Sequence, residues 1–191
     1  MRIDPTKDAL IVVDLQPDFM PGGPLAVSEG DRIAVPIGRL ARRFSTVVAT
    51  QDWHPEGHVS FARQGGPWPI HCLAGSRGAA VHGDLPDTLV TSYLRKGTRK
   101  DVDSYSAFCD DAGLATGLGG YLKERGVARL FVVGLARDYC VRATALDGAA
   151  AGFEVLVVDD LTRPVDPASR ARVDGDFAAG QVALVDSAAL S

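Results

Sequence analysis

The stretch RLFVVGL at residues 129–135 is a short apolar run rich in β-branched residues, a pattern typical of a strand buried on both faces. Five further runs of this kind, which we also predict to be strands, are ALIVVDL (9–15), TVVATQ (46–51), TLVTSYL (88–94), EVLVVDD (154–160) and QVALVDS (181–187). The segments between them are rich in alanine and leucine with charges at helical spacing, and predict helices at 30–43, 112–125, 140–151 and 167–179. This alternation predicts a three-layer α/β fold, in which helices cover both faces of a mostly parallel six-stranded sheet.

The length and composition fit one globular domain spanning residues 1–191. The chain has 191 residues, of which 46% are apolar and 23% charged, enough to build a single core. Glycine, proline and histidine concentrate within residues 52–87, which we interpret as one long loop inside the domain. No internal repeat or interdomain linker is visible.

The charge pattern argues against a polyanionic partner. The net charge is −4, and acidic and basic residues are interspersed, which argues against binding to nucleic acid or to an anionic membrane.

The first apolar run is interrupted by Asp14 and is too short for a signal sequence or a membrane span, so we expect a cytoplasmic protein. A reducing compartment would keep Cys72, Cys109 and Cys140 as thiols. The oligomeric state stays open.

Polar side chains stand where the predicted strands end. In open parallel sheets, ligands bind beyond the carboxyl ends of the strands. The residues found there are Asp14, then Asp52 with His54 and His58, then Lys96, and finally Gly134 leading into Cys140. We therefore expect a carboxylate, an amine, a thiol and a metal-binding cluster to converge on one edge of the sheet.

Taken singly, these residues have simpler explanations. An aspartate after a strand, such as Asp14, is a common turn residue, and a lysine such as Lys96 is usually a solvated charge. Cys72 and Cys109 fit the usual role of a free cysteine, a small buried side chain. Cys140 differs because it stands at the predicted start of the helix 140–151, where backbone N–H groups and the helix dipole favour a thiolate. This is a position suited to a nucleophile.

A metal site is predicted in the long loop. Asp52 and His54 are two residues apart, so in an extended segment both side chains point to the same side, and His71 follows later. Oxygen and imidazole donors suit a divalent ion, zinc first, with iron or manganese as alternatives. His58 is a candidate fourth ligand, whereas His82 lies outside the loop and fits a surface role. Each histidine alone could equally be a capping or surface group.

Three aromatic residues are candidates for the substrate pocket. Phe19, Trp68 and Tyr105 lie in segments that contain glycine or proline near the groups named above. Aromatic residues of this kind are as often core residues as pocket walls.

Five ordered segments resemble the successive motifs of the nicotinamidase family, within the isochorismatase-like cysteine hydrolases. They are VVDLQPDFMPGGPLAV (12–27), TQDWHPEGHVSFA (50–62), WPIHCLAGSRGA (68–79), RKGTRKDVDSYSAF (95–108) and VVGLARDYCVRATALDGAAAGFEV (132–155). The resemblance implies a Rossmann-type sheet and hydrolysis of nicotinamide, and of pyrazinamide, in NAD salvage. One departure is Arg137, which stands where threonine is frequent and puts the rim of the pocket in question.

The resemblance also implies roles for individual residues. Asp14, Lys96 and Cys140 match the catalytic triad, and Asp52, His54 and His71 match the metal ligands that hold the pyridine nitrogen. In the family, a cis peptide bond precedes the residue matching Ala136, and the N–H groups of Ala136 and Cys140 face the developing oxyanion. These roles predict a thioester mechanism in which Asp14 takes the proton of the Cys140 thiol.

Three alternatives remain at this stage. A related cysteine amidase acting on a carbamoyl or ureido compound would share the nucleophile but lack the metal. A flavodoxin-like nucleotide- or flavin-binding module is disfavoured because no G-x-G-x-x-G or G-x-x-x-x-G-K-[ST] sequence is present. A structural zinc site in an inert protein would make the fold depend on the metal.

Overall fold

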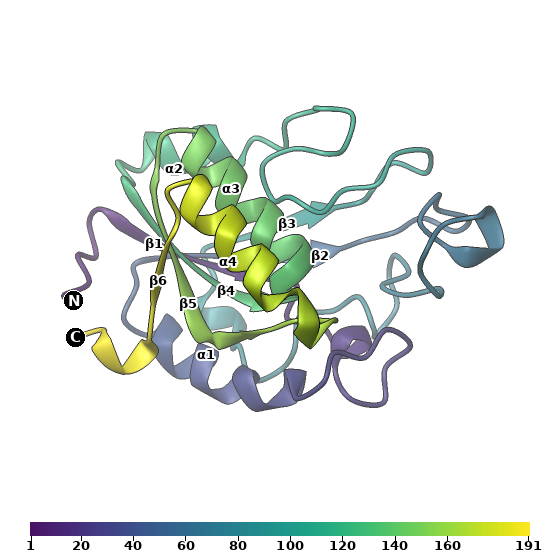
Figure 1. Cartoon of the computed structure of the whole chain (residues 1–191), viewed down its shortest axis with the longest axis horizontal. Coiled ribbons are helices and arrows are strands. Elements are labelled where there is room, and N and C mark those ends of the chain that lie inside the picture. The colour runs from purple at the N-terminus through teal and green to yellow at the C-terminus, as the bar shows by residue number, and fades with distance from the viewer.

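The computed structural model describes residues 1–191, and its centre is a six-stranded sheet (Figure 1). The strands are β1 (Asp8–Val13), β2 (Thr46–Asp52), β3 (Ser92–Lys96), β4 (Arg129–Leu135), β5 (Glu154–Arg163) and β6 (Ala183–Val185). They are ordered β3-β2-β1-β4-β5-β6, and every neighbouring pair is parallel. The predicted fold class is confirmed, and the sheet is wholly rather than mostly parallel.

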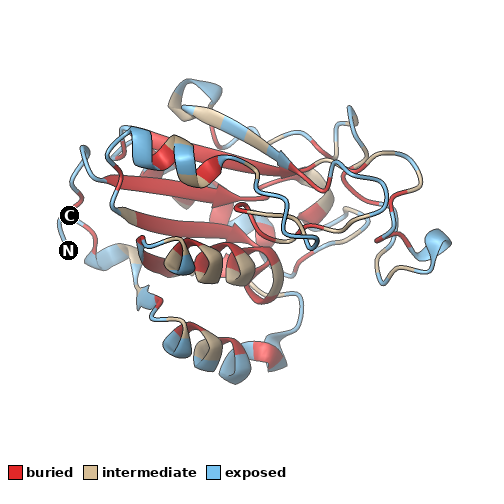
Figure 2. Cartoon of the chain, turned by 90° about the horizontal axis from the view of Figure 1, so that it is seen from above, coloured by how far each residue is buried: buried red, intermediate tan, exposed pale blue.

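Helices cover both faces of the sheet, as the alternation of strands and helices predicts. They are α1 (Ala34–Ala41), α2 (Leu118–Glu124), α3 (Arg142–Ala150) and α4 (Arg170–Ala179). Alternate residues of β1 point to opposite faces: Leu10 and Val12 join the apolar cluster that contains α1, whereas Ile11 joins the cluster that contains α2, α3 and α4. Figure 2 shows that the strands at the centre of the sheet are buried, whereas the helices in front of them expose their outer faces to solvent.

Several predicted boundaries were too wide, for local reasons. The segment predicted as a helix from residue 112 is helical only from Leu118, because Gly113 and Gly117 have φ of +81° and +93°, outside the right-handed helical region. The strand predicted at 88–94 begins instead at Ser92, because a tight turn that starts at Pro86 continues through Leu89. Cys140 lies before α3 in a wide turn, Arg137–Val141, and not inside the helix.

The strand order reverses between β1 and β4, which places a crevice at their carboxyl ends. Gly134 makes this junction possible: its φ is +110°, and a Cβ there would lie 2.0 Å from the carbonyl oxygen of Val13. The long loops gather at this end of the sheet, opposite the two chain termini (Figure 1). None of the helices combines the length and apolar character needed to cross a membrane.

Candidate active site

Four strand ends bring a thiol, an ammonium group and two carboxylates together. Asp14 follows β1, Asp52 and Lys96 are the last residues of β2 and β3, and Cys140 lies in the turn after β4. The Lys96 Nζ atom lies 2.8 Å from Asp14 Oδ2 and 3.3 Å from Cys140 Sγ, and it donates a hydrogen bond to Asp52 Oδ1. All four residues are buried. The structure therefore assembles the groups that the sequence predicted would converge.

Burial sets the protonation of this cluster. Burial alone would lower the pKa of Lys96. The nearby carboxylates of Asp14 and Asp52 have the larger, opposite effect and hold this pKa well above its ordinary value. Burial raises the pKa of Asp14, against the opposing effect of Lys96. The Asp14 Oδ1 atom accepts a hydrogen bond from Thr50 Oγ1 at 2.6 Å, whereas Oδ2 forms the ion pair with Lys96 and accepts no other hydrogen bond.

The thiol of Cys140 is buried. Burial raises its pKa well above the ordinary value, although the Lys96 ammonium acts in the opposite direction. Burial therefore outweighs the effect expected of the helix start, and the thiol needs a base, as the predicted transfer of its proton to Asp14 requires. The turn that carries it is closed by hydrogen bonds from the N–H groups of Tyr139 and Val141 to the Ala136 carbonyl, both 3.1 Å. The peptide bond between Leu135 and Ala136 is cis.

Asp52, His54 and His71 present their donor atoms to one point. These atoms lie within 4.8 Å of one another, and the Nε2 atoms of His54 and His71 are 3.5 Å and 3.8 Å from Asp52 Oδ2. Each Nδ1 atom faces a backbone carbonyl, that of Gly97 at 3.1 Å for His54 and that of Pro69 at 2.8 Å for His71. Since a carbonyl only accepts, Nδ1 carries the hydrogen and Nε2 keeps its lone pair. The three residues fit a divalent metal ion.

Two neighbours fix the position of His54. The backbone at Gly97 approaches the ring so closely, with φ of +63°, that a Cβ there would lie 2.4 Å from His54 Cε1. His58 stacks on the other side of His54, with ring centroids 4.1 Å apart. Both ring nitrogens of His58 have partners, Ser60 Oγ at 2.7 Å and the Val102 carbonyl at 3.1 Å. His58 therefore supports His54 and is not grouped with the three residues whose donor atoms converge, and its role as a fourth ligand stays open.

The Cys140 thiol and two of the metal-binding residues, Asp52 and His71, line one small aromatic pocket. All three aromatic residues predicted from the sequence line it, and the full lining is Phe19, Leu25, Asp52, Trp68, His71, Tyr105, Ala136, Tyr139, Cys140 and Val165. Trp68 Nε1 donates a hydrogen bond to the Tyr105 hydroxyl at 3.1 Å, and the Trp68 ring packs edge-on against Tyr139 with centroids 5.0 Å apart. The pocket is thus shaped for a small flat ring.

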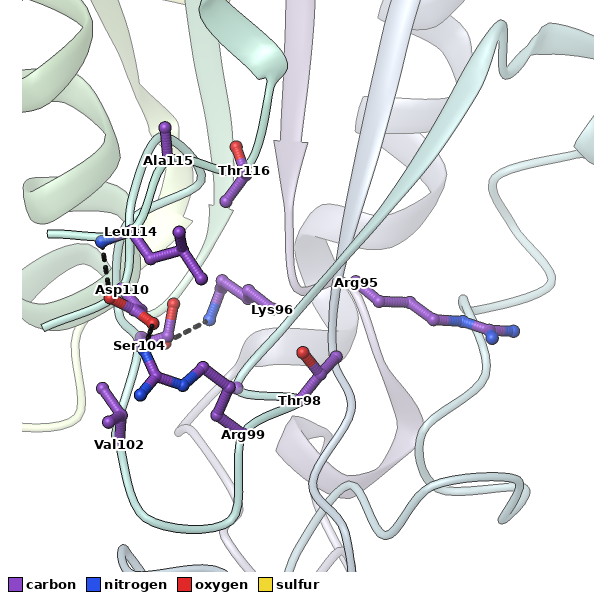
Figure 3. A pocket seen from close by; sticks show the side chains of 11 residues that line it. Arg95, Lys96, Thr98, Arg99, Val102, Ser104, Asp110, Leu114, Ala115 and Thr116 are labelled. Carbon is purple, nitrogen blue, oxygen red and sulfur yellow. Dashed lines mark hydrogen bonds and ion pairs between the residues drawn. The ribbon is translucent and has the colours of Figure 1, made fainter. Parts of the chain in front are cut away.

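A second cavity lies behind Lys96, between the chain that follows β3 and residues 110–116 (Figure 3). It is larger than the aromatic pocket, and the two share no lining residue. The Lys96 side chain, which donates a hydrogen bond to the Ser104 carbonyl at 3.3 Å, has no exposed surface there. This cavity therefore gives no access to the thiol.

The sequence did not identify the residues that hold the strand ends in place. Gln16 pairs with the backbone of Asp52 in both directions, accepting from its N–H and donating to its carbonyl, each at 2.9 Å. The Asp18 carboxylate accepts a hydrogen bond from the Cys72 N–H at 2.6 Å, next to His71. Both follow β1 directly, in the segment QPD, and the polar residues of that segment are the one signal that could have pointed to them.

Arg137, whose departure from the family pattern puts the rim of the pocket in question, does not line the pocket. Its guanidinium group points to the far side of the turn, 2.8 Å from Asp159 Oδ1 of β5 and 2.6 Å from Asp174 Oδ1 of α4. Arg170 also binds both carboxylates, at 2.7 Å and 3.1 Å, which closes a ring of four charges. The ring fastens the nucleophile turn to the sheet and to α4.

Replacing Arg137 with methionine should lower the free energy of unfolding by about 1–3 kcal/mol, because an ion pair with one buried partner is lost. The Arg137 side chain is only 2% exposed, whereas that of Arg170 is 53% exposed. Arg170→Met is the matched control, and its cost should be under about 1 kcal/mol. Urea unfolding of the two variants measures the difference. Equal costs would show that burial of Arg137 does not matter.

The comparisons with known proteins agree with this geometry. The model of the isochorismatase domain family matches residues 8–186. The nicotinamidase of Acinetobacter baylyi is 43% identical over 175 residues, which cover 83% of this chain and 82% of that protein. Among solved structures, PnC1 from L. infantum in complex with nicotinate has a TM-score of 0.98 and 43% identity, and the match covers 100% of this chain and 98% of that one.

A further solved structure links the fold to a metal. Pyrazinamidase of Pyrococcus horikoshii, in complex with zinc, is 41% identical with a TM-score of 0.86, over 94% of this chain and 99% of that one. The match to the family model covers most of the chain, and these relatives exceed 40% identity over 82% to 99% of their own length. The chain therefore belongs to the isochorismatase family and, within it, to the nicotinamidases.

Proposed function

We propose that the chain hydrolyses nicotinamide to nicotinate and ammonia through a thioester on Cys140. The observation that carries this proposal is that Cys140 lines the same small aromatic pocket as Asp52 and His71. A pyridine ring with a carboxamide at its 3-position can place the amide at the thiol and the ring nitrogen at the metal-binding residues. Nicotinamidases at 40–43% identity support the same reaction.

The first half of the reaction forms the thioester. Asp14 Oδ2 takes the proton of the Cys140 thiol as the sulfur attacks the carboxamide carbon. The backbone N–H groups of Ala136 and Cys140 stabilise the oxyanion that forms. Asp14 then returns the proton to the amide nitrogen, the C–N bond breaks, and ammonia leaves.

The second half of the reaction releases nicotinate. Asp14 takes a proton from a water molecule as the water oxygen attacks the thioester carbon. The C–S bond breaks, and the proton on Asp14 returns to the Cys140 sulfur. Lys96 keeps its charge throughout and compensates Asp14 and the sulfur in turn, since it lies within 3.3 Å of both.

Asp52, His54 and His71 would hold one divalent ion, for which we propose zinc rather than iron or manganese. When bound, the ion supplies an electrophilic position for the ring nitrogen. The residues themselves support this assignment, because two imidazoles with fixed Nδ1 hydrogens and one carboxylate match a site with three protein ligands.

Replacing His71 with alanine should reduce the metal content well below one ion per chain and lower kcat/KM for nicotinamide by roughly 100-fold. Removing the metal from the unmodified protein with a chelator should stop turnover while the far-UV circular dichroism spectrum stays unchanged. Elemental analysis and an ammonia assay measure both effects, and His82→Ala is the control. Unfolding on chelation would instead indicate a structural metal site.

The decisive experiment measures ammonia release from nicotinamide, pyrazinamide and a set of carbamoyl and ureido compounds with one preparation. We expect turnover of nicotinamide, and of pyrazinamide as the second substrate. Turnover confined to carbamoyl or ureido compounds, in a protein without stoichiometric metal, would favour the related cysteine amidases instead. The cytoplasmic location stays a prediction, and the state of assembly stays open.

A further inference from the structure

Val165 forms the mouth of the aromatic pocket. The other nine lining residues are buried or half-buried, whereas Val165 is 37% exposed. It lies in the segment between β5 and α4, far along the chain from the aromatic residues of the pocket. A side chain that is both exposed and part of the lining marks the place where the pocket opens to solvent.

The segment that carries Val165 is held by one buried carboxylate. Asp138 is 4% exposed and accepts hydrogen bonds from the N–H groups of Val165 and Asp166, both at 2.9 Å, and from Ser169 Oγ at 3.3 Å. None of the ion pairs of the chain involves Asp138. A buried carboxylate without a cation is unfavourable unless N–H and O–H donors replace its hydration. The donors outside its own turn all come from residues 165–169.

This carboxylate ties the mouth of the pocket to the nucleophile. Asp138 and Cys140 belong to the same turn, two residues apart. The strap of residues 165–169 therefore keeps a fixed position relative to the sulfur, independently of the aromatic walls. Arg137, the residue before Asp138, fastens the other side of this turn to α4.

The chemistry of the substrate indicates which ring atom faces this mouth, and this step rests on the proposed function. In nicotinamide the carboxamide carbon must reach Cys140, and the ring nitrogen must reach the side of the pocket formed by Asp52 and His71. Ring position 5 lies across the ring from the edge between these two anchors. A substituent there leaves both anchors free and must project toward the open side of the pocket.

We propose that Val165 is a specificity-determining residue that excludes amides substituted at ring position 5, and that Asp138 is the positioning residue that holds Val165 in place. Together, Val165 and Asp138 limit the size of the aromatic amide that the pocket accepts. It has no part in the proton transfers at Cys140.

The test compares nicotinamide with 5-methylnicotinamide in the metal-loaded protein. Val165→Ala should raise the ratio of kcat/KM for the methylated amide to kcat/KM for nicotinamide by about tenfold, the usual effect of one methyl group in an apolar pocket. Val35→Ala, at a valine that is 44% exposed on α1, makes the same change away from the pocket and should leave the ratio unchanged. An unchanged ratio in Val165→Ala, with nicotinamide turnover intact, would overturn the role of Val165.

Asp138→Asn tests the strap separately. An amide group cannot accept both backbone N–H groups as a carboxylate does, so the strap should loosen and the same ratio should rise several-fold. A lower thermal midpoint with an unchanged ratio would overturn the positioning role and leave Asp138 as a structural residue. Absence of nicotinamide turnover in the unmodified protein would overturn the proposed function and this inference together, a result distinct from either of the others.

Discussion

Replacing Cys140 with alanine should abolish ammonia release from nicotinamide, lowering kcat by roughly 10⁴-fold or more, as removal of a catalytic nucleophile does in other hydrolases. The reason is that a thioester requires a thiol, and Cys140 is the only cysteine that lines the pocket. The metal content should be unchanged, since Asp52, His54 and His71 do not use the thiol. A discontinuous ammonia assay and elemental analysis of one preparation measure both.

Cys109→Ala is the matched control for this experiment. Cys109 is a half-buried thiol whose Sγ lies 3.4 Å from Asp147 Oδ2, outside the pocket, and its removal should change kcat by less than about twofold. Turnover that survives in Cys140→Ala would contradict a thioester mechanism. Equal losses in the two variants would point to general damage to the fold.

The architecture could be predicted because its signals are local. The run at residues 129–135 became β4 without any change of boundary, and β1 and β2 were displaced by at most two residues. Buried parallel strands are continuous apolar runs that need no information from distant residues. The boundaries that moved, at α2 and β3, depend on backbone conformations at Gly117 and around Pro86, which composition alone does not determine.

In the candidate site, too, some residues could be predicted from local signals and others could not. Asp14, Asp52 and Lys96 could be found because each ends a strand, and a parallel sheet brings strand ends to one edge. The contact between Asp138 and the strap of residues 165–169 could not be predicted. It joins Asp138 to Val165, 27 positions apart, through a hydrogen bond that no periodic pattern encodes. The burial of Cys140, which raises the pKa of its thiol, could not be predicted for a related reason: the sequence indicated only a helix start.

Replacing Lys96 with methionine should lower the free energy of unfolding by about 3–5 kcal/mol in the metal-free protein and reduce turnover below detection. The substitution keeps most of the side-chain volume but removes the only ammonium group between Asp14 and Asp52. Two buried carboxylates would then lack a cation, which is the costly way to break a buried ion pair. Urea unfolding measures the stability, and ammonia release measures the activity.

The dependence of this loss on pH identifies its cause. Without Lys96, the pKa of Asp14 in the folded protein would rise further above its unfolded value, because burial already raises it and the opposing charge is gone. A carboxyl group with a raised folded pKa binds its proton more tightly when folded, so the variant should regain stability relative to the unmodified protein as the pH falls from 8 to about 5. Lys123→Met, an exposed lysine on α2, should cost less than about 0.5 kcal/mol at every pH. A deficit in Lys96→Met that stays constant over this range would mean that lost packing, and not unpaired buried charge, destabilises the variant.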